Sequence, residues 1–486
     1  MCKYFLGIDQ GTTGVSALLC DRNFAPVARG YCEISQFYPE SGWVEHDPED
    51  VWQAVKTATQ IAMTKAEATP DDIIAIGIDH EGESVLLWDK ENGKAVYPSI
   101  VWQDKRTRAR AEELESEYGD LFRKKTALSP DSYFSATKIE WVLKNIPVSD
   151  SVIAGNNDAW ILYKMTGGRA HKTDASTASR TMLYNIESGT WDKELCDILG
   201  IDIAILPEIG DSARDFGVSD PDEFLGICAP IGAMLNDQQA ALLGQGCVGK
   251  GMLKTTYGTG CFILINTGDE PFRSENGLVT TVAWQIGGKR TFALDGGVYI
   301  AGAAIQWLRD GLGIIESPKD CEAICKSVPT NGGVYFVPAF SGLAAPYCDP
   351  NARGMITGLT RGTTRAHIVR AAEEAIAYQV ADLVKIIEQD ADIEISLMRC
   401  DGGAVRDGFL MQFGADIMNI PLEIPSCTEA TARGAAFAAA VGVGLAELSD
   451  AEKLFEAEKR YIPSMPEDER IRLQNEWKTA VERVMK

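Results

Sequence analysis

Apolar runs and polar turns alternate along the chain. Residues 4–21 and 251–268 share one layout, in which two apolar runs flank a turn of glycine and threonine. Short apolar runs around such a turn predict a β-hairpin. The same layout at two distant places suggests an internal duplication, with one copy opening each half of the chain. A third glycine turn, at residues 401–404, follows another short apolar run.

Three other stretches repeat their apolar residues at helical spacing, namely residues 50–66, 366–389 and 470–486. Because strand-like and helix-like segments alternate between them, the pattern favours an α/β fold. The 486-residue chain is also too long for one ordinary hydrophobic core. We therefore predict two domains, residues 1–245 and 246–486, which meet in a glycine-rich stretch at residues 244–251.

The net charge of −24, from 70 acidic and 46 basic residues, narrows the choice of partners. No basic cluster offers a track for a phosphate backbone, so we expect no nucleic-acid partner. No apolar run approaches the roughly 20 residues of a membrane helix, and the first residues lack a signal-peptide pattern. We therefore expect no membrane insertion and a cytoplasmic location. The 12 cysteines are scattered, which favours reduced, mostly buried thiols.

The turn from Asp9 to Gly14 carries the first candidate chemistry. Its glycines let the backbone approach a ligand, and its amides and threonine hydroxyls form an anion-binding nest. Asp9 is suited to hold Mg²⁺ through the water shell of the ion. One such turn alone is also consistent with an ordinary hairpin. Together with the turns at residues 257–260 and 401–404, it predicts a cleft that holds nucleotide phosphates from both sides. Neither the P-loop nor the dinucleotide fingerprint occurs at these turns.

Asp237 precedes the helix-like residues 240–245. A carboxylate near the start of a helix is stabilised as the anion, which suits a proton acceptor and a helix cap equally. The local pattern leaves both roles open.

Ten stretches, spread nearly from end to end, are long and specific: DQGTTG (9–14), GWVEHDPEDVW (42–52), WQDKRT (102–107), SYFSATK (132–138), TDASTASRTMLYN (173–185), NDQQAALLGQ (236–245), YGTGCF (257–262), AGAAIQWLRD (301–310), PAFSGLAAPYCDPNARGMITGLTRGTT (338–364) and DGGAVRDGFLMQF (401–413). In these stretches and in their order, the chain resembles the FGGY family of carbohydrate kinases, and within it the glycerol kinases. The resemblance implies two actin-like (ribonuclease H-like) α/β domains with a nucleotide cleft between them.

The resemblance also implies the roles of individual residues. Asp237 matches the general base that removes a proton from the substrate hydroxyl, and ATP with Mg²⁺ supplies the phosphoryl group. The other implied substrate contacts are Glu83, Trp102, Tyr133 and Gln238. The implied nucleotide contacts are Thr12, Thr13, Thr259, Gly302, Gln306, Gly403 and, where an asparagine is usual, Asp407. Ser16 is a second departure, because those enzymes usually carry an arginine there.

Residues 79–84 depart most from the glycerol kinase pattern, because they read DHEGES where those enzymes read TNQRET. Glu83 keeps a glycerol-binding position, whereas Gly82 replaces an arginine that also binds glycerol. Many carboxylates and few cations disfavour anionic substrates but suit hydroxyl donors. The lost side chain suggests extra volume and a polyol or ketose of four or five carbons. In the competing interpretation, His80 or Lys105 takes the place of the arginine and glycerol remains the substrate.

His80 is a structural histidine in one interpretation and a substrate contact in the other, and we expect Asp79 and Glu81 to be peripheral. We therefore expect ATP-dependent phosphorylation of a hydroxyl of a small neutral polyol or sugar, either glycerol or a somewhat larger polyol. A kinase for a ketose such as xylulose or erythrulose is the main alternative. A non-catalytic polyol and ATP sensor, or an ATPase of the same clamp design, is a remote one. The resemblance further implies a homodimer or homotetramer.

Overall fold

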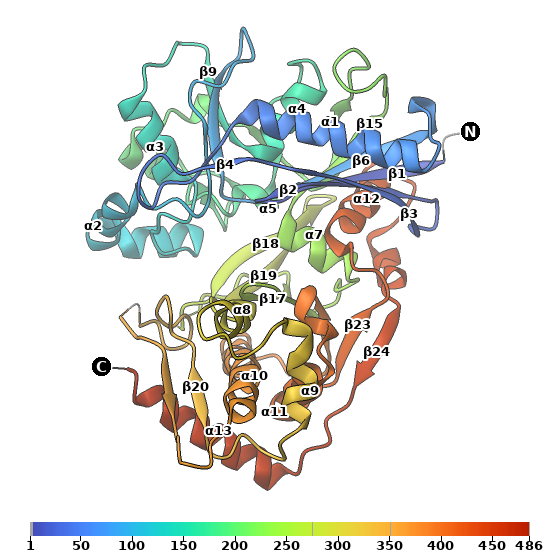
Figure 1. Cartoon of the computed structure of the whole chain (residues 1–486). Helices are drawn as coiled ribbons and strands as arrows, with labels where there is room; N and C mark the ends of the chain where they lie inside the picture. Colours follow the sequence, from blue (N-terminus) through green and yellow to red (C-terminus); the bar gives the residue numbers. More distant parts are fainter. Residues whose placement is uncertain (1–2, 275, 350, 486) are drawn as a thin grey trace.

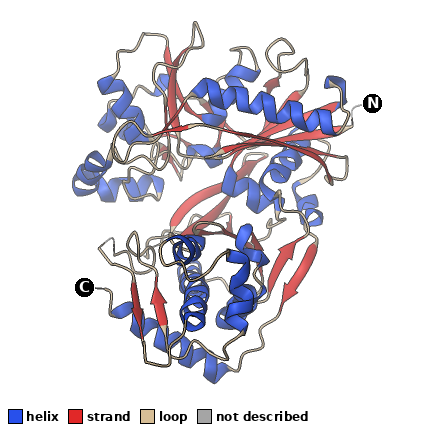
Figure 2. Ribbon diagram, viewed as in Figure 1, coloured by secondary structure: helices blue, strands red, loops and turns tan. Residues whose placement is uncertain are grey.

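The computed structural model describes residues 3–274, 276–349 and 351–485. Helices and strands form two lobes, with the N-terminal half of the chain in one and most of the C-terminal half in the other (Figures 1 and 2). Within the described ranges, no helix combines the length and the apolar character needed to span a membrane. The arrangement confirms the predicted α/β class.

A six-stranded sheet in the order β14-β15-β6-β1-β2-β3 forms the centre of the first lobe. β6 pairs in parallel with both β1 and β15, whereas β2 is antiparallel to β1. A five-stranded sheet in the order β4-β5-β8-β7-β9 lies in the same half of the chain. These strands are β1 (Tyr4–Gln10), β2 (Gly14–Cys20), β3 (Pro26–Glu33), β4 (Gln36–Phe37), β5 (Glu45–His46), β6 (Ile73–His80), β7 (Val85–Asp89), β8 (Ser99–Ile100), β9 (Val152–Asn156), β14 (Ala213–Val218) and β15 (Pro230–Asn236).

A seven-stranded sheet in the order β18-β19-β17-β16-β22-β23-β24 forms the centre of the second lobe. β16 and β17 form an antiparallel hairpin, and β22 lies parallel to β16. The strands of this seven-stranded sheet are β16 (Leu253–Tyr257), β17 (Cys261–Gly268), β18 (Val279–Ile286), β19 (Lys289–Val298), β22 (Met398–Asp401), β23 (Leu422–Pro425) and β24 (Ala457–Tyr461). Three pairs of short strands complete the described sheets: β10 (Lys172–Asp174) with β13 (Glu208–Gly210), β11 (Tyr184–Asn185) with β12 (Thr190–Trp191), and β20 (Tyr335–Val337) with β21 (Met355–Thr357).

Each half thus opens with a hairpin whose first strand pairs in parallel with a later strand, β1 with β6 and β16 with β22. The two predicted hairpins are confirmed. The predicted helices are also confirmed, as α1, α10 and α13. The helices are α1 (Pro48–Lys65), α2 (Arg108–Thr126), α3 (Ala136–Asn145), α4 (Asn157–Met165), α5 (Ala175–Ala178), α6 (Lys193–Leu199), α7 (Asp237–Gly244), α8 (Gly302–Asp310), α9 (Cys321–Lys326), α10 (Arg365–Ala391), α11 (Gly408–Met418), α12 (Ala430–Gly442) and α13 (Glu467–Glu482).

Helix α12 belongs by sequence to the second half but packs against β1, β6 and β15 of the first (Figure 1). Glycines on these strands make the close approach possible. A β-carbon on Gly7 would lie 1.9 Å from the carbonyl oxygen of Ala432, and one on Gly232 would lie 2.4 Å from that of Ala439. The division at residue 245 remains a prediction, and the packing of α12 crosses it.

Gly77, at the centre of β6, gives a direct test of this close packing. A β-carbon there would lie 1.9 Å from the carbonyl oxygen of Ala435, and a helix backbone cannot rotate away as a side chain can. We expect Gly77→Ala to lower the free energy of unfolding by about 1–3 kcal/mol, measured by urea denaturation. Gly362→Ala is the matched control, because its β-carbon would meet only ordinary contacts. Equal stability of the two variants would contradict the packing argument.

Candidate active site

Three acidic residues meet where the central strands of the first sheet end. Asp9 on β1 pairs with Asp79 on β6, and Asp79 pairs with Leu235 on β15, two residues before Asp237. Ligands of open α/β sheets bind beyond the carboxyl ends of such parallel strands. The sequence predicted Asp9 and Asp237 as site residues, whereas Asp79 was expected to be peripheral and lies beside both.

Asp9 and Asp79 are direct neighbours across β1 and β6, and each carboxyl group affects the pKa of the other. Burial raises the pKa of Asp9 to about 6, and burial and the charge of Asp9 raise the pKa of Asp79 well above its usual range. Among the residues that the structure describes, none donates a hydrogen bond to either oxygen of Asp79. The pair therefore offers unsatisfied oxygen atoms next to the first glycine turn.

Asp237 begins helix α7, directly after β15. One carboxylate oxygen accepts a hydrogen bond of 2.6 Å from the backbone N–H of Gln238. Burial, then the charges of Glu83 and Asp9, raise its pKa to about 7, while Lys254 acts in the opposite direction. A carboxylate with such a pKa can accept a proton near neutral pH.

A second cluster contains most of the residues predicted to bind substrate. The Nε of Arg180 lies 2.6 Å from a carboxylate oxygen of Glu83, and Nη2 of the same arginine donates to the hydroxyl of Tyr133 at 3.2 Å. The ring of Trp102 lies edge-to-face against Tyr133, with centroids 5.6 Å apart. Trp102 Nε1 donates to the hydroxyl of Thr12 at 2.9 Å, which joins this cluster to the first glycine turn.

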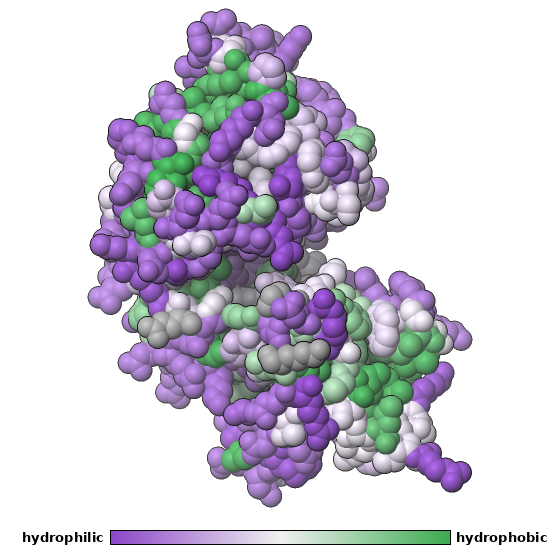
Figure 3. Space-filling view, turned by 90° about the vertical axis from the view of Figure 1, so that its left-hand side faces the viewer, coloured by the Kyte–Doolittle hydropathy of each residue, from purple (hydrophilic) through white to green (hydrophobic). Residues whose placement is uncertain are grey.

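Two cations of the site were missed by the sequence reasoning, and both join the halves of the chain. Nη1 of Arg180 lies 3.1 Å from a carboxylate oxygen of Asp295 on β19. Lys254 on β16 is fully buried and donates to the side-chain oxygen of Gln238. Arg180 lies in one of the ten quoted stretches and Lys254 in the predicted hairpin at residues 251–268, but neither pattern marks a cation of the site. Only the apposition of the two halves reveals this role. Figure 3 shows the deep notch between the two lobes.

The place of the missing arginine is neither empty nor taken by the predicted residues. Both ring nitrogens of His80 are occupied, by the carbonyl of Glu81 at 2.8 Å and by the hydroxyl of Thr177 at 2.9 Å. This pairing argues against the predicted substrate contact of His80. Lys105 is exposed, and the cation beside Glu83 is Arg180. The vacated volume expected at Gly82 is partly filled by the side chain of Asn236.

The second and third glycine turns lie side by side, because β16 and β22 are parallel neighbours with Thr256 opposite Asp401. The carbonyl oxygen of Thr259 accepts hydrogen bonds from two backbone amides at the start of α8, which brings Thr259 close to Gly302. Gly403 follows β22 and has open space around its α-carbon. The structure thus brings together three of the predicted nucleotide contacts, while Thr13 and Gln306 are exposed.

The two departures from the glycerol kinase pattern on the nucleotide side, Asp407 and Ser16, have local structural explanations. Asp407 caps helix α11 and accepts from the backbone amides of Phe409 and Leu410 at 2.8 and 3.0 Å. Its carboxylate is therefore engaged within the protein. Arg29 on β3 donates to the hydroxyl of Ser16 at 2.7 Å, so a guanidinium from the neighbouring strand reaches this position.

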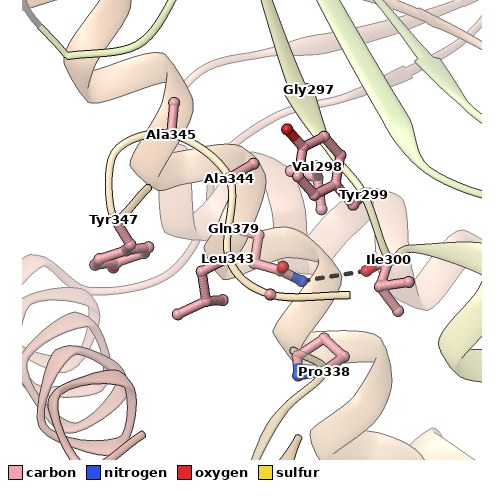
Figure 4. A pocket seen from close by; sticks show the side chains of 11 residues that line it. Gly297, Val298, Tyr299, Ile300, Pro338, Leu343, Ala344, Ala345, Tyr347 and Gln379 are labelled. Atoms are coloured by element: carbon pink, nitrogen blue, oxygen red, sulfur yellow. Dashed lines mark hydrogen bonds between the residues drawn. The ribbon is translucent and has the colours of Figure 1, made fainter. Parts of the chain in front are cut away.

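A separate small pocket lies in the second lobe, between the end of β19 and the loop around Leu343 (Figure 4). Gln379 donates to the carbonyl oxygen of Ile300 at 3.4 Å along its wall. None of the predicted site residues lines this pocket, so it lies apart from the two clusters.

Comparison with known proteins agrees with this arrangement. The models for the N-terminal and C-terminal domains of the FGGY family of carbohydrate kinases match residues 4–244 and 253–443. Glycerol kinase 2 of Thermotoga maritima is 48% identical, and glycerol kinase of Carboxydothermus hydrogenoformans is 47% identical, each over 99% of this chain and 98% of its own length.

Solved structures show the same fold. Plasmodium falciparum glycerol kinase with ADP superposes with a TM-score of 0.94 at 34% identity, covering 99% of this chain and 98% of its own. A xylulose kinase from Lactobacillus acidophilus, at 23% identity and a TM-score of 0.88 over 99% and 97% of the two chains, shares the fold. The predicted resemblance is confirmed: the chain belongs to the FGGY family of carbohydrate kinases.

Proposed function

We propose that this kinase transfers the terminal phosphoryl group of ATP to a hydroxyl of a small neutral polyol, either glycerol or a somewhat larger one. The observation that carries the proposal is Asp237, a partly buried carboxylate at the junction of β15 and α7, with a pKa raised to about 7. Its charge interacts with Glu83 and Tyr133, which Arg180 joins into one cluster. A hydroxyl held by this cluster would be close to such a base. The glycerol kinases to which the chain is similar support this substrate class.

Asp237 removes the proton of the substrate hydroxyl as the oxygen attacks the phosphorus. Lys254 neutralises part of the surrounding negative charge, and its contact with Gln238 fixes the first turn of α7. Closure of the lobes excludes water, which disfavours wasteful hydrolysis of ATP. The backbone amides of the three glycine turns position the phosphates.

The residues at the strand ends fit Mg²⁺. Asp9 and the unsatisfied oxygens of Asp79 are hard oxygen donors beside the first glycine turn. Among the described residues, no group of three or more histidine, cysteine or acidic side chains forms a complete metal site. This agrees with Mg²⁺, which proteins usually hold through one or two carboxylates together with substrate phosphates. When bound, the ion neutralises charge on the transferring phosphoryl group.

The site holds more carboxylates than cations, since Arg180 is already paired with Glu83 and Asp295, and Lys254 offsets only part of the charge around Asp237. An anionic substrate such as a sugar acid is therefore disfavoured.

Neutral polyols and ketoses both remain compatible with the site. A kinase for a four- or five-carbon ketose is therefore the second candidate. Gly82 in the place of an arginine favours a larger substrate only as far as the side chain of Asn236 leaves that space open. We also propose a cytoplasmic homodimer or homotetramer, in keeping with the use of ATP and with the resemblance to glycerol kinases.

A coupled assay of ADP release across glycerol, tetritols, pentitols, ketotetroses and ketopentoses tests the proposal. We expect turnover with at least one neutral polyol and none with gluconate. A ketose as the best substrate would favour the second candidate. If no compound is turned over but one raises the denaturation temperature, the chain is a sensor.

The pH dependence of kcat/KM for the polyol follows from the raised pKa of Asp237. Only the deprotonated carboxylate accepts a proton, so we expect kcat/KM to fall about tenfold per pH unit below a midpoint near pH 7. Glu83→Gln removes the neighbouring charge that helps to raise this pKa, so the midpoint is expected to move to lower pH. If the midpoint stays at the same pH in Glu83→Gln, the fall of kcat/KM at low pH is caused by the protonation of another group, such as ATP.

A further inference from the structure

Asn236 and Gly82 are sterically complementary. The side-chain nitrogen of Asn236 lies 1.5 Å from the position that a β-carbon on residue 82 would occupy. Any side chain at residue 82 would therefore displace the amide of Asn236. The two residues precede Glu83 and Asp237, whose carboxylates are near enough for Glu83 to raise the pKa of Asp237.

The amide nitrogen of Asn236 has no hydrogen-bond partner within the described part of the chain, although the residue is only 2% exposed. Its oxygen caps helix α7 through a 3.3 Å hydrogen bond from the backbone N–H of Gln238. A buried donor without a partner is costly, and native structures rarely retain one without a reason. The unpaired N–H points to an acceptor that arrives with a ligand.

We propose that Asn236 is a specificity-determining residue whose amide donates a hydrogen bond to an oxygen of the polyol, in the place of the arginine absent at residue 82. This inference rests on the proposed function and deepens it. Glu83 and Asp237 accept hydrogen bonds from substrate hydroxyls, and the amide supplies a neutral donor between them. A hydroxyl satisfies both demands, because it donates and accepts.

A neutral amide has consequences for the substrate class. The site already holds the guanidinium of Arg180, which is paired with Glu83 and Asp295. An arginine at residue 82 would add a second permanent positive charge, which an amide does not. The amide also occupies the position of the first side-chain atoms that an arginine at residue 82 would have. An arginine at residue 82 therefore requires a smaller residue at position 236, and Gly82→Arg alone is expected to impair the site rather than to improve glycerol use.

The test separates the donor role from the cap role. Asn236→Ser keeps an oxygen that can cap the helix but removes the amide. We expect kcat/KM for the best polyol to fall roughly 3- to 10-fold, with the KM for ATP and the denaturation temperature little changed. Gly82→Ala displaces the same amide, so it is expected to give a similar loss. The double variant is expected to be no worse than either single one, because both changes remove one interaction.

Deoxy analogues of the best polyol identify the acceptor; for glycerol these are the two propanediols. The wild-type enzyme is expected to lose activity with the analogue that lacks the accepting oxygen, and Asn236→Ser is expected to lose that discrimination. Unchanged kcat/KM in Asn236→Ser, or multiplicative losses in the double variant, would overturn the inference. The rise in denaturation temperature caused by the polyol gives an independent reading of binding. If the wild-type protein shows this rise without turnover, the proposed catalysis fails, and the effect of Asn236→Ser on the rise still decides the inference.

Discussion

Replacement of Asp237 by asparagine is expected to lower kcat by roughly 10²- to 10⁴-fold, because the amide cannot accept the proton of the attacking hydroxyl. Asparagine has the same size, and its side-chain oxygen can still accept from the backbone N–H of Gln238. The fold and the binding of ATP are therefore expected to persist. Coupled ADP release measures kcat, and the shift in denaturation temperature on addition of ATP measures nucleotide binding.

Glu373→Gln is the matched control for this variant. Glu373 lies on α10 in the second lobe, outside both clusters of the candidate active site, and burial raises its pKa to about 8, so it is protonated near neutral pH. Glutamine therefore replaces a neutral acid with a neutral amide, and we expect kcat to change less than about tenfold. Near-normal turnover of Asp237→Asn would remove Asp237 from the role of base. Equal losses in both variants would indicate a general effect of replacing an acid by an amide.

The position of Asp237 illustrates what the sequence could predict. A helix-like run after the acid placed it at the start of a helix, and α7, which begins at Asp237, confirms this. The strand β15 that ends just before Asp237 was not predicted. The glycine turns were predictable, because turn chemistry and strand periodicity are both local. The partners of Asp237 were not, because Lys254 lies on a strand of the other half.

The glycines against which α12 packs could not be predicted from the sequence either. Gly7, Gly77 and Gly232 lie on three strands that are distant in sequence, and only the parallel register of the sheet aligns them beneath one helix. Periodicity within a single strand does not indicate such a shared face. The steric relation between Gly82 and Asn236 arises in the same way, since Gly82 lies just beyond β6 and Asn236 ends the neighbouring strand β15.

Replacement of Arg180 by methionine is expected to lower the free energy of unfolding by about 3–5 kcal/mol, because it leaves the buried carboxylate of Glu83 without its partner. The side chains of Arg180 and Glu83 are 4% and 5% exposed and only 2.6 Å apart. Methionine retains most of the apolar contacts of the arginine side chain. Arg180 also contacts Asp295 across the two halves, so the variant is expected to raise the KM for the polyol. Urea denaturation and the substrate titration measure the two effects.

Arg123→Met provides the surface comparison, because Arg123 and Glu115 form an ion pair with side chains 41% and 44% exposed. Water already solvates these charges, so the loss of this ion pair is expected to lower the free energy of unfolding by at most about 1 kcal/mol. Adding Glu83→Gln to Arg180→Met removes the unpaired charge and is expected to restore part of the stability. The reason is that the cost of the single variant comes from an uncompensated buried carboxylate and not from lost attraction alone. Equal costs for the buried and surface variants, or no recovery in the double variant, would show that Glu83 gains a new partner or water when Arg180 is absent.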